Sequence, residues 1–277
     1  MSFEIIKRYK TFDGETLFCQ HESQSTKTIM KFSVYLPDKI EKIESAIIWL
    51  SGLTCTEENF ITKAGAQKYL SHTKTMIICP DTSPRGLGIP GEDDSYDFGS
   101  GASFYVNATT ENYRDHYQMY DYISLDLLKL LREDFGVTKY SIMGHSMGGH
   151  GALMIGLKEK DLFHSISAFS PIVNPVECAW GKKAFNGYLG SNEEGWKSYD
   201  TCELVKSGAK HKNPILIDQG LQDEFYPDQL LTKNLESIAI ELGLDLQVYY
   251  REGYDHSYYF ISSFIESHIQ FHLNYLK

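Results

Sequence analysis

The sequence has little positive charge and no long hydrophobic run. Its 277 residues include 26 Lys and Arg against 37 Asp and Glu, so the formal net charge is −11. A nucleic-acid surface needs clustered basic residues to neutralise phosphates, and an anionic membrane surface attracts the same residues. No stretch approaches the roughly 20 apolar residues of a transmembrane helix. We therefore expect neither a nucleic acid nor a membrane as a partner.

Cysteine is also sparse. The five cysteines are scattered, and none has the C-x-x-C spacing that is typical of a metal site. The start of the chain, Met1-Ser2-Phe3-Glu4, lacks a basic region followed by an apolar run, so we expect no signal peptide. Unpaired cysteines without a secretion signal favour a cytoplasmic location.

The order of apolar segments indicates a single domain over residues 1–277. Alternating stretches within residues 3–37 predict one or two antiparallel strands at a sheet edge. Apolar strands and helical segments then alternate, which predicts a mostly parallel sheet with helices on both faces. The expected strands are 46–50, 75–79, 139–143, 166–169, 214–218 and 246–250, and the expected helices are 59–70, 113–135, 149–157 and 258–275.

Ligand sites in such sheets lie beyond the carboxyl ends of the strands. Two long loops, 81–112 and 170–195, follow strand ends and are expected to wall a site.

The string Gly144-His145-Ser146-Met147-Gly148 matches G-x-S-x-G between a predicted strand and a predicted helix. That context is what the nucleophile turn of an α/β-hydrolase requires. The turn exposes the Ser146 hydroxyl, and glycines keep the neighbouring strand and helix free of a clashing Cβ. It also places the Met147 N–H at a helix N-terminus, where it can bind a developing oxyanion. Ser146 is therefore the candidate nucleophile.

A serine needs a base, and in this fold the chain order is Ser, then Asp or Glu, then His. His256 lies between the last predicted strand and the last predicted helix, where the base belongs. The other histidines after Ser146 do not occupy such a position; they are His150, His164, His211, His268 and His272.

Three carboxylates compete for the role of the acid that orients His256. Asp223 lies on the loop beyond the strand 214–218 and is favoured by the geometry the acid must have. Asp218 still belongs to the strand terminus, and Asp255 would have to fold back onto its neighbour. A turn or a helix N-cap is the alternative explanation for Asp223.

The second oxyanion donor is expected in the loop 51–55. The Leu53 N–H is the first choice, and the N–H of either neighbouring residue is the alternative. Gly52 lets the backbone approach closely there. Cys55 would then lie near Ser146. Two interpretations stay open for it: a thiol whose modification blocks the pocket, or a small buried side chain.

Seven stretches, one of which contains the G-x-S-x-G motif, give the chain a family likeness. From about residue 10 to the C-terminus it resembles the S-formylglutathione hydrolase family, also called the esterase D family. The likeness is carried by Trp49–Thr56, Pro80–Gly86, Tyr96–Gly99, Gly144–Gly151, Trp180–Phe185, Ile217–Gly220 and Gly253–Tyr258. Together they are far more specific than G-x-S-x-G alone.

The resemblance implies an α/β-hydrolase fold and a cytoplasmic homodimer without metal or cofactor. The implied reaction is hydrolysis of S-formylglutathione to formate and glutathione, the last step of glutathione-dependent formaldehyde removal. The resemblance also supports Ser146, Asp223 and His256 as the triad, and Leu53 and Met147 as oxyanion donors. One departure is Glu111-Asn112-Tyr113, where many relatives have Pro-Trp ahead of the long helix.

A formyl substrate implies a small acyl pocket. Trp180 is either a wall of that pocket or an ordinary packing aromatic. Lys182 and Lys183 are either partners of a glutathione carboxylate or solvated surface lysines.

The alternative functions are a broad short-chain carboxylesterase, acyl transfer to an alcohol, and a binding protein on an inactive hydrolase fold. The complete triad argues against the last of these.

Overall fold

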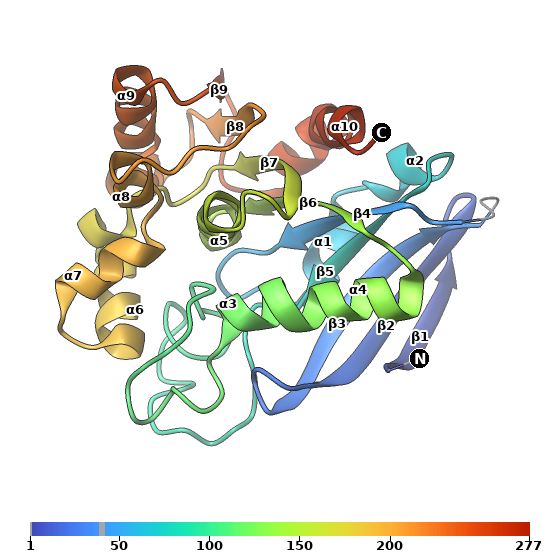
Figure 1. Ribbon diagram of the computed structural model, residues 1–277, viewed down its shortest axis with the longest axis horizontal. Helices are drawn as coiled ribbons and strands as arrows, with labels where there is room; N and C mark the ends of the chain where they lie inside the picture. The colour runs from blue at the N-terminus through green and yellow to red at the C-terminus, as the bar shows by residue number, and fades with distance from the viewer. Residues whose placement is uncertain (1, 39–41) are drawn as a thin grey trace.

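One nine-stranded sheet runs through the residues that the computed structural model describes, 2–38 and 42–277. From edge to edge the strands follow the order β1-β2-β3-β5-β4-β6-β7-β8-β9 (Figure 1). The pairs β1–β2, β2–β3 and β3–β5 are antiparallel, and every later pair is parallel. This confirms the predicted mostly parallel sheet with an antiparallel N-terminal edge.

The strands are β1 (Glu4–Lys10), β2 (Gly14–Ser23), β3 (Thr28–Pro37), β4 (Ser45–Leu50), β5 (Thr75–Pro80), β6 (Lys139–His145), β7 (Phe163–Phe169), β8 (Ile215–Gly220) and β9 (Leu246–Arg251). The α-helices are α1 (Glu57–Lys63), α2 (Gln67–Leu70), α3 (Met119–Asp121), α4 (Leu128–Phe135), α5 (Met147–Lys158), α6 (Ala179–Leu189), α7 (Glu193–Trp196), α8 (Thr201–Lys206), α9 (Thr232–Leu242) and α10 (Tyr258–Tyr275). Short 3₁₀ and π-helical segments complete the order: η1 (Tyr122–Leu127), η2 (Pro175–Glu177), η3 (Lys197–Tyr199) and η4 (Tyr226–Leu230).

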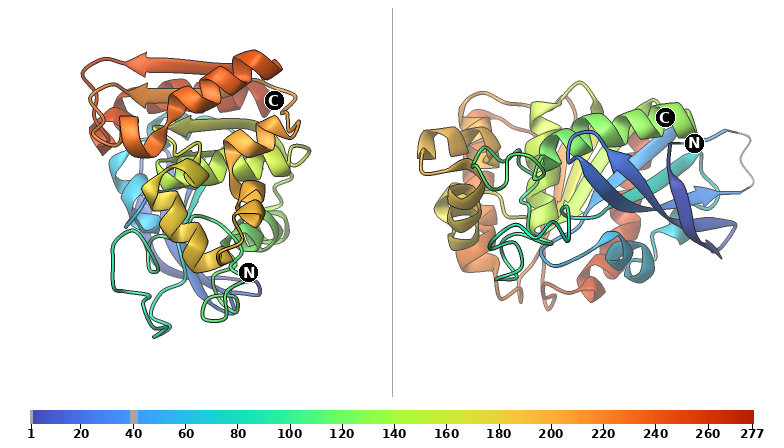
Figure 2. Two further views of the ribbon diagram at one scale, coloured as in Figure 1. Left: turned by 90° about the vertical axis from the view of Figure 1, so that its left-hand side faces the viewer. Right: turned by 90° about the horizontal axis from the view of Figure 1, so that it is seen from below.

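Helices cover both faces of the sheet (Figure 2). Side chains alternate between the faces of a strand, so β4 supplies two separate hydrophobic cores. Ala46, Ile48 and Leu50 belong to the core that includes α4 and α5. Ile47 and Trp49 belong to the other, which α1, α2 and α10 complete. Because β4 is buried on both faces, its sequence is a continuous apolar run rather than an alternating one.

The antiparallel edge is larger than expected. Residues 3–37 form three strands instead of one or two, since β1 pairs along β2 at the rim of the sheet. Six of the seven β1 residues are exposed, so the strand lacks the alternation that reveals a half-buried strand. Apolar side chains exposed at this edge include Ile6, Tyr9 and Phe12.

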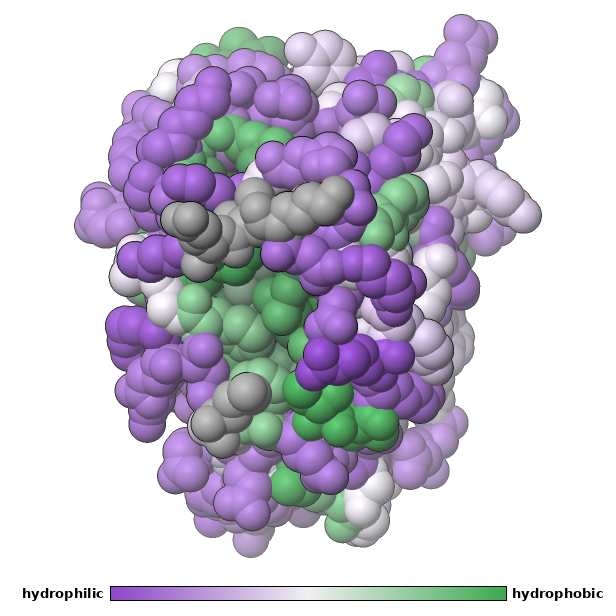
Figure 3. Space-filling model, turned by 90° about the vertical axis from the view of Figure 1, so that its right-hand side faces the viewer, coloured by the Kyte–Doolittle hydropathy of each residue, from purple (hydrophilic) through white to green (hydrophobic). Residues whose placement is uncertain are grey.

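The sheet end that carries these strands is shown in Figure 3, where hydrophobic residues line a hollow bordered by hydrophilic ones. No helix within the described residues is long and apolar enough to cross a membrane.

Three helical expectations need correction. The predicted helix 59–70 is two helices, α1 and α2, because Gly65 between them adopts a left-handed φ of 72°. The predicted helix 113–135 begins only at Met119, since Tyr113 and Tyr117 precede it in turns and pack against Tyr188. The expected loop 170–195 contains η2 and α6.

Candidate active site

The loop that follows β4 and the turn that follows β6 leave neighbouring strands at the same edge of the sheet. β4 and β6 are parallel partners, and Leu50 is paired with Gly144 at their carboxyl ends. After β4 the chain enters α1 on one face, and after β6 it enters α5 on the other. Such a divergence opens a crevice beyond the strand ends. The loop after Leu50 therefore lies beside the turn that contains Ser146.

Ser146 occupies a strained turn. Its φ of 58° and ψ of −120° lie outside the regions that a serine usually adopts. The turn fits only because the residues two before and two after Ser146 are glycines. A Cβ on Gly144 would lie 2.2 Å from the Gly148 carbonyl oxygen, and one on Gly148 would lie 2.0 Å from the Leu50 carbonyl oxygen. The glycines of the motif are thus required by the contact between β4, β6 and α5.

This packing predicts that Gly148→Ala lowers the free energy of unfolding by about 3 kcal/mol, the upper end of the cost of overpacking. The added methyl meets backbone atoms of Leu50, which cannot rotate away. Gly195→Ala is the matched control, because the nearest atom to its new Cβ is the Asn192 Nδ2 at 3.9 Å. Urea unfolding of both variants measures the difference. Equal stability of the two variants would contradict this account of the turn.

Two backbone N–H groups near Ser146 have no internal acceptor in the described part of the chain. Met147 is the first residue of α5, and its N–H is one of the unpaired donors of a helix N-terminus. Leu53 lies between Gly52, whose added Cβ would come within 3.0 Å of the Ser146 Cβ, and Thr54, whose N–H is bonded to Gly101. The two donors predicted from the sequence are therefore both unpaired in the structure.

The predicted base and acid contact each other directly. The Nδ1 of His256 lies 2.5 Å from the Oδ2 of Asp223. The other carboxylate oxygen of Asp223 accepts a hydrogen bond of 3.0 Å from the Phe225 N–H, and the side chain is buried. A carboxylate on Nδ1 leaves Nε2 of His256 to act on a hydroxyl. His256 and Ser146 line the same cavity.

The competing carboxylates are engaged elsewhere. Asp218 is buried and paired with Arg251 at 3.0 Å, and burial raises the pKa of the Asp218 carboxyl. Asp255 accepts hydrogen bonds from the backbone and side chain of Ser257, the N-cap residue of α10. Neither carboxylate forms a hydrogen bond with His256 among the described residues.

Four of the five remaining late histidines form hydrogen bonds outside the cavity of Ser146. His150 contacts the Phe104 carbonyl oxygen, and His211 contacts the Phe163 carbonyl oxygen. His268 and His272 on α10 are fully buried and share the Ser167 hydroxyl between them. Burial lowers the pKa of both rings, so they pack α10 onto β7 as neutral groups.

His145 is a neighbour of the base that the sequence analysis did not single out. Its ring centre lies 4.3 Å from that of His256. Burial, and then the proximity of His256, lowers the pKa of His145 well below its usual value. A neutral ring therefore supports the base without competing for its proton. Only its position next to Ser146 in the motif would have pointed to it.

The cavity at Ser146 measures about 340 Å³. Trp180 forms part of its wall together with Tyr96 and Phe225, and the indole N–H donates to the Tyr96 hydroxyl at 3.3 Å. The other lining residues are Gly52, Leu53, Thr54, Cys55, Asn59, Lys63, His145, Ser146, His256, Ser257 and Tyr258.

Several residues considered in the sequence analysis do not line this cavity. Lys182 faces Glu177 at 3.8 Å, and Lys183 forms an ion pair with Asp97. The departure at residues 111–113 also lies outside the cavity lining.

Cys55 lines the cavity and is partly buried. Burial raises the pKa of its thiol, although the charges of Lys63 and Arg85 act in the opposite direction. A thiol with a raised pKa is a poor nucleophile at neutral pH because the thiolate is the reactive form. The structure thus shows a thiol in the cavity without the activation that a catalytic cysteine needs.

Cys55→Ala is accordingly expected to keep kcat within about tenfold of the wild-type value, since no step of serine catalysis uses the thiol. Steady-state hydrolysis of 4-nitrophenyl acetate measures this directly. A loss as large as that expected for removal of Ser146 would contradict the assignment of the nucleophile.

No group of three or more His, Cys, Asp or Glu side chains in residues 2–38 and 42–277 is arranged to hold a metal ion.

Comparison with known proteins agrees with this geometry. The Esterase family model matches residues 23–271. The S-formylglutathione hydrolase of Rattus norvegicus is 49% identical over 281 aligned residues, with 100% of both chains covered. The enzyme of that name from Arabidopsis thaliana is 49% identical, with 97% of this chain and 96% of the relative covered. The chain belongs to the S-formylglutathione hydrolase family of esterases.

A solved structure supports the same family. The S-formylglutathione hydrolase of Agrobacterium tumefaciens superimposes with a TM-score of 0.94 at 40% identity, and 99% of each chain is covered. Membership of the S-formylglutathione hydrolase family makes the chain a serine hydrolase acting on a small molecule.

Proposed function

We propose that the protein is a thioesterase that hydrolyses S-formylglutathione to formate and glutathione in the removal of formaldehyde. The observation that carries the chemistry is the His256–Asp223 pair, which opens into the same cavity as Ser146. The choice of substrate is supported by the 49% identity to S-formylglutathione hydrolases over their full length.

In the proposed mechanism the Ser146 Oγ attacks the formyl carbonyl carbon while Nε2 of His256 accepts the hydroxyl proton. Asp223 holds Nδ1–H and stabilises the imidazolium that forms. The N–H groups of Leu53 and Met147 donate to the oxyanion, and each such donor contributes on the order of 10²–10³ in rate. The carbon–sulfur bond then breaks, and the leaving sulfur takes the proton from His256.

The second half repeats the same steps with water. His256 takes a proton from a water molecule, whose oxygen attacks the formyl carbon of the ester on Ser146. Collapse of the tetrahedral intermediate returns the proton to the Ser146 Oγ and releases formate.

We infer one catalytic domain over residues 1–277 that acts as a cytoplasmic homodimer without metal or cofactor. The five cysteines support a reducing compartment, because none of them is in a disulfide within the described residues.

A broad short-chain carboxylesterase is the alternative, because the triad chemistry is common to esters and thioesters. Substrate preference distinguishes the two functions, and it is measured as the ratio of the kcat/KM values for the two substrates. We expect a higher kcat/KM for S-formylglutathione than for 4-nitrophenyl acetate. A preference for the acetate would overturn the thioesterase as the main role.

A further inference from the structure

Helix α1 forms one wall of the Ser146 cavity, and this wall carries a lysine, Lys63, that has no anionic partner among the described residues. Of the described residues that line the cavity, only Lys63 bears a fixed charge. No carboxylate in residues 2–38 or 42–277 forms an ion pair with it. Its Nζ lies 5.3 Å from the ring centre of Tyr258, which lines the same cavity two residues after His256. The ammonium group is thereby held near the catalytic base.

Asn59 precedes Lys63 by one helical turn and lies on the same face of α1. Its Oδ1 accepts hydrogen bonds from the backbone and hydroxyl of Thr56, which completes the capping box of the helix. This fixes the orientation of the amide. The Nδ2 group is left with its two N–H donors and no acceptor among the described residues, and Asn59 lines the cavity.

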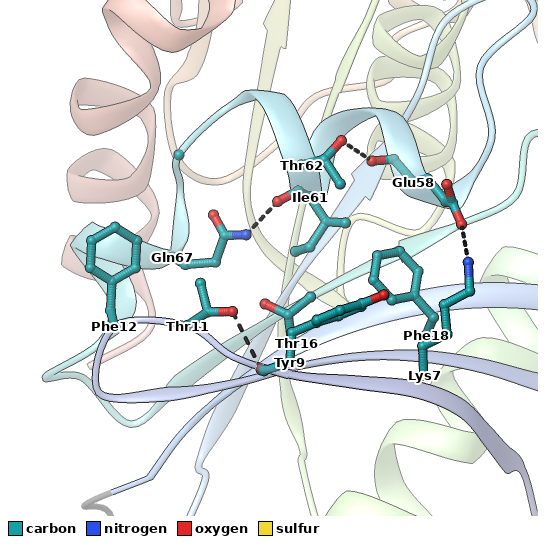
Figure 4. A pocket seen from close by; sticks show the side chains of 11 residues that line it. Lys7, Tyr9, Thr11, Phe12, Thr16, Phe18, Glu58, Ile61, Thr62 and Gln67 are labelled. Carbon is teal, nitrogen blue, oxygen red and sulfur yellow. Dashed lines mark hydrogen bonds and ion pairs between the residues drawn. The ribbon is translucent and has the colours of Figure 1, made fainter.

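The acidic residue nearest along α1 points the other way. Glu58 lines a different pocket with Thr62, and its carboxylate lies 3.3 Å from the Lys7 Nζ (Figure 4). The two faces of α1 are therefore distinct in charge. One face pairs Glu58 with the edge strand β1, while the other presents an amide donor and an ammonium to the cavity of Ser146.

We propose that Asn59 and Lys63 form the subsite that binds a carboxylate of the glutathione moiety. This inference rests on the proposed function, because it assigns the end of the substrate that leaves with the sulfur. A glutathione moiety carries carboxylates at both of its ends at neutral pH. In a protein with a net charge of −11, a local cation also offsets the general repulsion of an anionic substrate.

The subsite makes Lys63 a specificity residue, and its removal is expected to act on binding. Lys63→Met should raise KM for S-formylglutathione about tenfold, the scale of one hydrogen bond to a charged group, with kcat retained. KM for 4-nitrophenyl acetate should not change, because that substrate has no carboxylate. Lys63→Arg should restore most of the affinity.

Two further variants complete the experiment. Asn59→Asp keeps an acceptor oxygen for the capping box but replaces the amide donor with a negative charge, so KM for S-formylglutathione should rise. Lys68→Met is the matched control, since Lys68 is an exposed lysine on α2 that lies over Tyr69 and does not line the cavity. It should leave both substrates unaffected.

Two substrate analogues identify which carboxylate is bound. S-formylglutathione esterified at the glycine carboxylate should be insensitive to Lys63→Met if that carboxylate is the ligand. N-acetyl-S-formyl-cysteinylglycine, whose acetyl group keeps the cysteine nitrogen from taking the formyl group, should be insensitive if the ligand is instead the carboxylate of the γ-glutamyl residue. Both results support the subsite and differ only in the orientation of the substrate.

The outcomes separate the subsite from the proposed function. A wild-type protein that fails to hydrolyse S-formylglutathione overturns the function and the subsite with it. A wild-type protein that hydrolyses it, together with an unchanged KM in Lys63→Met or an equal rise in KM for 4-nitrophenyl acetate, overturns the subsite alone.

Discussion

Ser146→Ala is expected to reduce kcat by a factor on the order of 10⁶, the loss seen when the nucleophile of a serine hydrolase is removed. The Ser146 Oγ has no hydrogen-bond partner that an alanine would leave unpaired among the described residues. Serine and alanine both carry a Cβ, so the substitution adds no atom at the φ of 58°. Circular dichroism and thermal unfolding should therefore match the wild type while hydrolysis of S-formylglutathione disappears.

Ser262→Ala controls for the loss of a hydroxyl. Ser262 lies on the exposed face of α10, where its hydroxyl donates a hydrogen bond of 3.1 Å to the Tyr259 carbonyl oxygen. This variant should keep full activity. Hydrolysis by Ser146→Ala at a rate near that of the control would show that another group is the nucleophile.

Asp223→Asn is expected to lower kcat by about 10⁴, because an amide at this position favours the wrong tautomer of His256. An asparagine oxygen can still accept the bond from the Phe225 N–H, so the loop should keep its conformation. The variant tests the choice of acid, which the sequence left open between three carboxylates. Steady-state kinetics at saturating substrate gives the required kcat.

Asp255→Asn is the matched control for that choice. Asp255 adjoins His256 in sequence, but its carboxylate accepts hydrogen bonds from Ser257 and does not bond to the His256 ring. Its replacement should change kcat by less than about tenfold. A larger loss in Asp255→Asn than in Asp223→Asn would reverse the assignment of the acid.

Much of the central sheet could be predicted because its strands are buried on both faces. The runs at Ala46–Leu50 and Met76–Cys79 are apolar on both faces and end in a polar or turn residue, which marks both their type and their position. The edge strand β1 could not be found in the same way, since six of its seven residues are exposed and carry no alternating hydrophobic pattern.

Tertiary packing decided the helical segments that were predicted wrongly. Tyr113 and Tyr117 have the spacing of a helix, yet both lie before α3, where Tyr117 stacks on Tyr188 of α6 and Tyr113 contacts the same ring edge-on. Tyr188 is far from these two residues in the sequence, so local periodicity could not reveal that they lie outside the helix.

The chemistry at the strand ends could be predicted more fully than the substrate contacts. Ser146, His256 and Asp223 follow from a motif, a fixed chain order and the ends of strands. Asn59 and Lys63 follow from no motif. The subsite proposed for them depends on which face of α1 meets the cavity, whereas the sequence pointed only to Lys182 and Lys183 as partners of a glutathione carboxylate.

Labelling with a fluorophosphonate tests the central claim, an activated Ser146 in an open cavity, most directly. The reagent phosphonylates a serine only where a base and an oxyanion hole activate it. After digestion and mass spectrometry, the account predicts one adduct, on the peptide that contains Ser146, and none in Ser146→Ala. An unlabelled wild-type protein, or an adduct on another residue, would contradict it.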